Sequence, residues 1–204
     1  MKLTKRLSLF WLTMLAACVS QPVHQPDSLV AQLQQGGFVI FFRHGATDHS
    51  QQDTDLPHPS NCSAQRQLSE AGRQQAREIG EGFKLAGIPV GDAITSEYCR
   101  CVDTARIAFG KAQTSIDITS IQGVTPEERF RRIGALRGML NTVPKPDTNT
   151  VIVAHQWMFK DASGQTLEEG EAAIFKPQSE GAALMVKKVT PEQWKELVKP
   201  ATAN

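Results

Sequence analysis

The sequence predicts an α/β domain with a largely parallel central sheet. Two short apolar segments without charge, at 38–42 and 150–154, are typical of strands buried on both faces of a sheet. Such strand-like segments alternate along the chain with segments of helical periodicity, which indicates a parallel sheet covered by helices. Each of the two apolar segments leads into a histidine, His44 or His155. Because functional groups of these sheets collect beyond the carboxyl ends of the strands, we expect the site there.

The first half of the domain begins with a short helix at 28–35, which the glycine pair at 36–37 closes. After the strand at 38–42 comes a polar segment, 48–67, whose length is typical of a functional or mobile loop. Ser69 is the expected cap of the next helix, which carries apolar residues at helical spacing. The other elements expected in this half are a strand, a helix and a strand, at 93–95, 98–110 and 115–119.

The second half opens with a helix whose start is marked by a capping box, residues 125–128, with proline at the first helical position. The helix is predicted to end before Pro144 and to point four residues inward: Phe130, Ile133, Leu136 and Leu140. The remaining elements expected are three strands and a final helix that opens at Thr190, the strands being 150–154, 172–175 and 182–189.

The N-terminal residues are predicted to lie outside the fold. A basic start is followed by about 11 apolar residues, which is too short to span a bilayer but suits a secretory signal. Leu15-Ala16-Ala17-Cys18 resembles the bacterial lipoprotein processing box, with Cys18 as the lipidated residue. We therefore expect export to the periplasmic face of a bacterial membrane as a lipoprotein, anchored through Cys18. A simple cleaved signal with an incidental cysteine is the alternative.

On this basis the chain divides into four parts. They are a lipoprotein signal peptide, a tether, a domain of ordinary size and a short tail, at 1–17, 18–27, 28–199 and 200–204. The formal net charge is +1, from 22 basic and 21 acidic residues, so no basic field argues for nucleic acid as a partner.

The four cysteines indicate one disulfide in an oxidising compartment. With Cys18 used for lipid, three cysteines remain: Cys62, Cys99 and Cys101. Residues two apart on a helix point to different faces, so only one of the last two can pair with Cys62. We favour Cys62–Cys99, with Cys101 as the alternative partner. The cysteine and histidine spacing fits no zinc pattern, and we expect no metal.

The residues after the first strand suit phosphate chemistry. A phosphate monoester is a dianion, and the planar fork of arginine matches its oxygens better than lysine does. The sequence has neither paired carboxylates at metal spacing nor a glycine-rich phosphate loop. Histidine is the remaining nucleophile, since its ordinary pKa leaves a neutral fraction near neutral pH.

Four segments, in order, resemble the histidine phosphatase superfamily, the phosphoglycerate-mutase-like proteins. They are Arg43-His44-Gly45-Ala46-Thr47, the helix start at 68–76, the segment at 95–105 that contains Arg100, and the strand at 151–155. The resemblance implies a single three-layer α/β/α domain with a mostly parallel sheet, and a metal-independent phosphatase with no cofactor. It implies that His44 attacks phosphorus and that four residues bind the substrate phosphate: Arg43, Thr47, Arg100 and His155.

The general acid stays open. In one branch of the superfamily the acid lies in the connection after the second arginine, which here points to Glu127 or Glu128. Because Glu128 is the natural capping partner of Thr125, we favour Glu127 as a catalytic residue. In the other branch the acid follows the second histidine, where this chain has Gln156, which cannot donate a proton. Three further acids are alternatives: Asp48, Glu169 and Glu171.

Two functions are consistent with these residues. The first is an envelope-tethered phosphatase acting on a small or envelope-bound phosphate monoester, such as a sugar phosphate, a lipopolysaccharide core phosphate or an inositol phosphate. The second is a catalytically weak or inactive lipoprotein that binds a phosphorylated ligand or a partner protein. A binding pocket alone has no need of a nucleophile, so the sequence favours the phosphatase.

Overall fold

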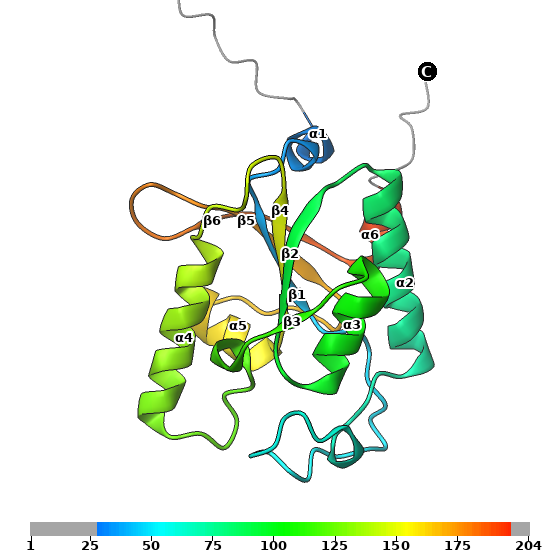
Figure 1. Cartoon of the computed structure of the whole chain (residues 1–204), viewed down its shortest axis with the longest axis vertical. Coiled ribbons are helices and arrows are strands. Elements are labelled where there is room, and N and C mark those ends of the chain that lie inside the picture. Colours follow the sequence, from blue (N-terminus) through cyan, green and yellow to red (C-terminus); the bar gives the residue numbers. More distant parts are fainter. Residues whose placement is uncertain (1–27, 197–204) are drawn as a thin grey trace, which may run out of the picture.

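A six-stranded sheet forms the centre of the computed structural model, which describes residues 28–196 (Figure 1). Its strand order is β3-β2-β4-β1-β5-β6. In chain order the strands are β1 Val39–Arg43, β2 Val90–Thr95, β3 Gln113–Thr114, β4 Asn149–Ala154, β5 Ala172–Lys176 and β6 Leu184–Val189. The pairs β3–β2, β2–β4 and β4–β1 are parallel, whereas β1–β5 and β5–β6 are antiparallel. The mostly parallel sheet confirms the predicted fold class.

Helices cover both faces of the sheet and give three layers (Figure 1). The helices are α1 Leu29–Gln34, α2 Glu70–Leu85, α3 Cys99–Phe109, α4 Pro126–Leu140, α5 Gln156–Ser163 and α6 Pro191–Glu196. In strand β1, Ile40 and Phe42 pack in the core with residues of α2, α3 and α6. The alternate residues Val39 and Phe41 pack with α4 and α5 on the other face. This alternation explains why the strand reads as a continuous apolar segment.

The strand register brings the two histidines together. In the parallel pair β1–β4, Arg43 is the partner of Ala154. The backbone N–H of His44 then donates to the carbonyl oxygen of Ala154 at 3.1 Å, so His44 and His155 leave the sheet side by side. On the far side of β4, Thr95 of β2 is paired with Val153, which places Ser96 beside His155. Three adjacent strands therefore deliver the candidate residues to one edge of the sheet.

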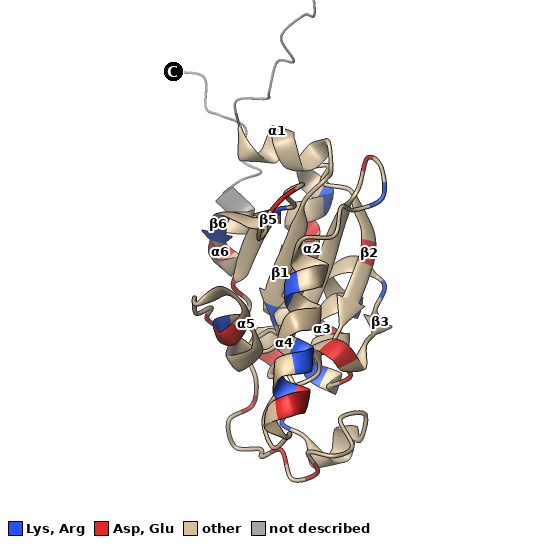
Figure 2. Cartoon of the chain, turned by 90° about the vertical axis from the view of Figure 1, so that its left-hand side faces the viewer, with Lys and Arg blue, Asp and Glu red and all other residues tan. Residues whose placement is uncertain are grey.

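The expected caps at Ser69 and Thr125 are present, and Ser28 caps α1 in the same way. The side chains of Ser28, Ser69 and Thr125 each accept a hydrogen bond from a backbone N–H of the first turn. At the end of α3, Gly110 adopts a left-handed conformation with φ of 70°, which glycine adopts without a steric cost. In α4 the acidic residues are confined to the first turn and the later charged residues are arginines, which Figure 2 shows in blue.

Two expectations from the sequence are wrong, and one helix was missed. Residues 115–119 do not form a strand: β3 is confined to Gln113–Thr114, and a 3₁₀ turn follows at Ile116–Ile118, because the Ser115 hydroxyl accepts from the N–H of Asp117. Phe130 does not point inward: it is 81% exposed, because it lies on the outer face of α4. The helix α5, which buries Met158 and Phe159, was not anticipated.

The expected signal peptide at 1–17, the tether at 18–27 with Cys18, and the tail at 200–204 lie outside the described residues. Within residues 28–196, no helix has the length and apolar character needed to cross a membrane.

Candidate active site

A polar cavity of about 360 Å³ lies beyond the carboxyl ends of β1 and β4. The loop 48–67 borders it, and in Figure 1 this loop crosses the end of the sheet opposite α1. Four residues predicted from the sequence line the cavity: Arg43, His44, Arg100 and His155. The structure therefore brings together side chains from three separate segments of the chain.

His44 is oriented and kept neutral by its surroundings. Its side chain is buried, and Nδ1 lies 2.9 Å from the carbonyl oxygen of Gly45. Because a carbonyl oxygen only accepts, Nδ1 carries the proton of the neutral ring and Nε2 keeps its lone pair. Burial lowers the pKa of His44 well below its ordinary value, and repulsion from Arg100 adds to the effect. The ring is therefore a neutral nucleophile at neutral pH.

The turn after His44 depends on a close backbone approach. A Cβ at Gly72, in the first turn of α2, would overlap the carbonyl oxygen of Ala46. The N–H of Ala46 donates to Oε1 of Gln75 at 2.9 Å, and that of Gly45 donates to Oγ1 of Thr104 at 3.1 Å. Helices α2 and α3 thus fix the turn, and this contact requires glycine at position 72.

His155 stands beside His44, with ring centroids 5.6 Å apart. Its Nε2 lies 2.8 Å from Oγ of Ser96, which also accepts from the N–H of Tyr98. With the Ser96 hydroxyl donating to Nε2, the proton of the neutral ring sits on Nδ1. Burial lowers the pKa of His155 well below its ordinary value, with repulsion from Arg100 as the next cause.

Arg43 is the first of the cavity's cations. One guanidinium nitrogen donates to the carbonyl oxygen of Leu167 at 3.0 Å, and the other lies 3.4 Å from Glu169 Oε1. The side chain of Gln156 accepts from the N–H of Leu167 at 2.8 Å, so it supports the residue that holds Arg43. Burial lowers the pKa of Arg43 although Glu169 opposes the shift.

Arg100, at the start of α3, is buried and held from two sides. Its guanidinium lies 4.4 Å from the ring centroid of Tyr98. Both terminal nitrogens donate to the carboxylate of Asp53, at 2.9 and 3.0 Å. The two carboxylate oxygens of Asp53 occupy the fork that a phosphate would use, so this residue of the loop is a competing anion.

A disulfide ties the loop to the same helix. Cys62 and Cys99 are joined with their Cα atoms 5.6 Å apart, and Cys99 directly precedes Arg100. The N–H of Cys99 also donates to Oε1 of Gln65 in the loop at 3.0 Å. Cys101 is a free buried thiol, and burial raises its pKa to about 12. The loop is thus fixed to the element that carries the second arginine.

Comparison with known proteins agrees with this geometry. The family model described as histidine phosphatase superfamily (branch 1) matches residues 39–123. The matched residues, less than half of the chain, include Arg43, His44 and Arg100 of the cavity. A search of curated protein sequences finds no match.

Three solved structures show the same fold. The protein histidine phosphatase SixA, complexed with tungstate, matches with a TM-score of 0.57 and 13% identity, over 76% of this chain and 98% of that chain. The product of open reading frame Rv3214 from Mycobacterium tuberculosis matches with a TM-score of 0.53 and 13% identity, over 74% of this chain and 96% of that chain. A phosphoserine phosphatase from Entamoeba histolytica, in complex with 3-phosphoglyceric acid, matches with a TM-score of 0.51 and 14% identity, over 74% of this chain and 95% of that chain.

Two other residues predicted from the superfamily resemblance lie elsewhere. Thr47 does not line the cavity: its hydroxyl donates to Glu169 Oε1 at 2.8 Å, and through Glu169 it supports Arg43. Glu127 is exposed in the first turn of α4 and does not line the cavity either. A hydrogen bond to a backbone N–H and one to Thr125 lower its pKa, as expected of a carboxylate at a helix start.

The alternative acids are placed as follows. Glu128 binds Arg131 and Arg132. Asp48 binds Ser50, and Glu171 accepts from the N–H of Glu168 at 2.8 Å. Asp53, which the sequence did not single out, is the carboxylate among the described residues that line the cavity.

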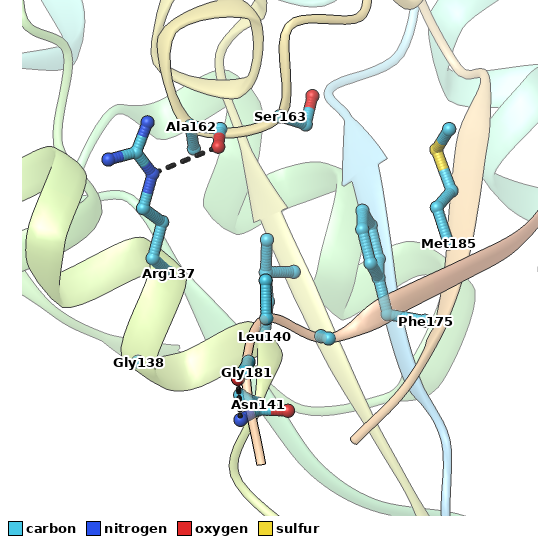
Figure 3. A pocket seen from close by; sticks show the side chains of 11 residues that line it. Arg137, Gly138, Leu140, Asn141, Ala162, Ser163, Phe175, Gly181 and Met185 are labelled. Carbon is cyan, nitrogen blue, oxygen red and sulfur yellow. Dashed lines mark hydrogen bonds between the residues drawn. The ribbon is translucent and has the colours of Figure 1, made fainter. Parts of the chain in front are cut away.

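A second, larger cavity of about 560 Å³ lies away from these residues (Figure 3). It is mainly apolar, and Leu140, Phe175 and Met185 line it. Arg137 at its edge is already engaged by the carbonyl oxygens of Asp161 and Ala162. In residues 28–196 no group of three or more His, Cys, Asp or Glu side chains could hold a metal ion. The smaller, polar cavity is therefore the candidate active site.

Proposed function

We propose that the chain is an envelope-tethered phosphatase that hydrolyses phosphate monoesters, without a metal ion, through a phosphohistidine on His44. The observation that supports this best is the state of His44. The ring is neutral, is oriented by Gly45, and shares one cavity with Arg43 and Arg100. A histidine held in this way is a nucleophile beside a site for a dianion.

In the first step, Nε2 of His44 forms a bond to phosphorus while the bond from phosphorus to the ester oxygen breaks. The guanidinium groups of Arg43 and Arg100 donate to the nonbridging oxygens, where charge builds up. The departing alcohol needs a proton. Asp53 is held as a carboxylate partner of Arg100, so it is not presented as a donor in this arrangement. Esters with good leaving groups are therefore expected to react fastest.

In the second step, the oxygen of a water molecule bonds to phosphorus and the bond to Nε2 breaks. Inorganic phosphate leaves, the water proton passes to solvent or to phosphate, and His44 returns to its neutral form. His155 lies close enough to donate a hydrogen bond from Nδ1 to the phosphoryl group in both steps, since the two rings are 5.6 Å apart.

The mouth of the cavity favours a leaving group with an apolar face. Trp157, 51% exposed, and Leu56, 39% exposed, both line it. The ring of Trp157 has Lys160 Nζ 5.3 Å from its centroid. Sugar and inositol rings pack their C–H faces against aromatic side chains while their hydroxyls stay in water, which suits this mouth.

The tether belongs to the same proposal. Helix α1 lies at the end of the sheet opposite loop 48–67 (Figure 1), and that loop borders the cavity. A lipid at Cys18 would attach the domain to the membrane through the segment that precedes α1.

The decisive test is release of phosphate by the full chain. We expect hydrolysis of p-nitrophenyl phosphate to continue unchanged in the presence of EDTA. We also expect a radiolabelled phosphate ester to leave a protein-bound label that is labile in acid and stable in alkali, as a phosphohistidine is. Loss of activity on chelation would contradict the metal-free mechanism.

The second function is a protein that binds a phosphorylated ligand without turnover. The ion pair between Asp53 and Arg100 favours it, because Asp53 occupies the donors that a reacting phosphate would need. Such a protein would bind inorganic phosphate tightly, show no turnover and take up no covalent label. The labelling experiment therefore separates the two functions.

Asp53→Asn is expected to tighten the binding of inorganic phosphate. The carboxylate competes with phosphate for both donors of Arg100, and an amide offers one neutral acceptor in its place. We expect the inhibition constant of phosphate to fall by about tenfold, since a charged hydrogen bond contributes roughly 1.5–3 kcal/mol.

The matched control is Asp48→Asn. Asp48 lies in the same loop, is partly exposed, binds Ser50 and does not line the cavity, so this variant makes the same charge change away from the phosphate site. If Asp53→Asn weakened phosphate binding instead, Asp53 would be a positioning residue that holds Arg100 for its substrate.

A further inference from the structure

A third arginine lines the cavity outside the segments that resemble the superfamily. Arg66 lies near the end of loop 48–67, and its side chain contributes to the cavity wall. Its guanidinium makes no hydrogen bond or ion pair with another residue in the part of the chain that the structure describes, 28–196. Its Nε is nevertheless buried.

Of the three arginines that line the cavity, Arg66 is the one whose charge is not balanced by a nearby carboxylate among the described residues. Of the other two cavity arginines, Arg43 lies 3.4 Å from Glu169 and Arg100 is paired with both oxygens of Asp53. Among the described residues, no carboxylate faces Arg66 in the same way. The positive charge with which the cavity meets an incoming anion is therefore mainly that of Arg66.

The backbone of Arg66 is fixed against the residues of the site. Its N–H donates to Oδ1 of Asp53 at 2.9 Å, and its carbonyl oxygen accepts from Arg100 at 3.3 Å. The preceding residue, Gln65, accepts from the N–H of Cys99, next to the disulfide. The backbone that carries the Arg66 side chain is therefore held in place beside Arg100, whereas an arginine at the tip of a loop has no such support.

The buried donors of the site point to a ligand with several acceptors. Within residues 28–196, five buried side-chain nitrogen or oxygen atoms have no hydrogen-bond partner, and three of them are the Nε atoms of Arg43, Arg66 and Arg100. All three arginines line the same cavity. Buried donors are normally paired, so this cluster fits an anion that offers acceptor oxygens in several directions.

We propose that Arg66 is a third phosphoryl-binding residue, which donates to a nonbridging oxygen of the substrate alongside Arg43 and Arg100. The inference rests on the proposed function, because it takes the phosphoryl group as the anion of the cavity. A phosphoryl group has three nonbridging oxygens, which three guanidinium groups can share. Arg66 is then a catalytic residue supplied by the loop.

The test is calorimetric titration of the full chain with inorganic phosphate, which requires no turnover. We expect Arg66→Gln to raise the Kd of phosphate by about ten- to hundred-fold, the effect of losing a charge-assisted hydrogen bond. Arg66→Lys keeps the positive charge but loses the planar guanidinium, so its Kd for phosphate should lie between those of the wild type and Arg66→Gln. The control Arg106→Gln makes the same charge change at an exposed position of α3 and should leave the Kd unchanged.

A pH profile supplies a readout that a merely structural role would not change. Neutral His44 is the reactive form, so kcat/KM falls as the pH drops through the pKa of His44. Burial, Arg100 and Arg43 lower that pKa, and Arg66 contributes to the same effect. Removing the charge of Arg66 raises the pKa, so the acid limb of kcat/KM should move to higher pH in Arg66→Gln and stay in place in Arg106→Gln.

Two results would overturn the assignment. The first is an Arg66→Gln variant that binds inorganic phosphate as tightly as Arg106→Gln. The second is a loss confined to esters with a second anionic group, which would place Arg66 on the leaving group. If Arg66→Gln melts well below the wild type, Arg66→Lys decides by the same criteria. Failure of the proposed function is distinct, since it would appear as phosphate binding by the wild type without hydrolysis.

Discussion

His44→Ala is expected to lower kcat for p-nitrophenyl phosphate by about 10⁵- to 10⁶-fold, the loss found when an enzyme's nucleophile is removed. No other side chain of the cavity is placed to replace it. The Nε2 atom of His155 is held by Ser96, and Cys101 keeps its proton because burial raises its pKa to about 12. The same variant should take up no covalent label from a radiolabelled ester.

The matched control is His58→Ala. His58 is exposed, lies in loop 48–67 and pairs with Asp55, so its removal deletes an imidazole away from the cavity. Thermal melting of His44→Ala is needed beside it, because the His44 side chain is buried. Activity within about tenfold of the wild type in a folded His44→Ala variant would mean that a different group attacks phosphorus, and the phosphohistidine mechanism would have to be abandoned.

The central strands could be predicted because their composition already reflects their burial. Residues of β1 face helices on both sides, so none of Val39 to Phe42 can be polar, and the pattern is visible locally. The capped starts of α2 and α4 were predictable for the same reason, since Ser69 and Thr125 act on N–H groups three residues away. Such signals are local in the sequence.

The wrong predictions about the fold concern residues whose structure depends on contacts with distant parts of the chain. Residues 115–119 alternate as a strand does, yet the sheet offers β3 a partner only at Gln113–Thr114, opposite the end of β2. Phe130 keeps helical spacing with Ile133. However, the residues of α4 that pack in the core are Ile133, Leu136 and Leu140, and Phe130 is not among them. Spacing along a helix indicates which residues share a stripe, and tertiary packing decides where the stripe ends.

The site shows the same division. Arg43, His44, Arg100 and His155 were predictable because each occupies a fixed place beside a strand or helix end. Asp53 and Arg66 belong to a loop whose path depends on contacts with α3, among them the Cys62–Cys99 disulfide across 37 residues. No local pattern in 48–67 shows which of its polar residues reach the cavity. The signal that was available, the length of the loop, indicated a functional segment without naming its residues.

Arg100→Lys is expected to reduce kcat/KM for p-nitrophenyl phosphate by about 10²- to 10³-fold, the effect of losing a donor to developing transition-state charge. Lysine keeps the positive charge but cannot offer two parallel N–H donors. The Arg100 guanidinium now meets the two oxygens of Asp53 in that geometry and packs at 4.4 Å from the centroid of the Tyr98 ring. A phosphoryl group that replaces Asp53 requires the same fork.

The control for this change is Arg106→Lys, on the same helix and exposed. The double variant Arg100→Lys/Asp53→Asn then separates two roles of the arginine. If Arg100 binds phosphate, removing Asp53 cannot restore kcat/KM, because the fork itself is missing. Recovery to the wild-type value would show that the fork serves only to satisfy Asp53 within the loop, in which case phosphate binding would fall to Arg43 and Arg66.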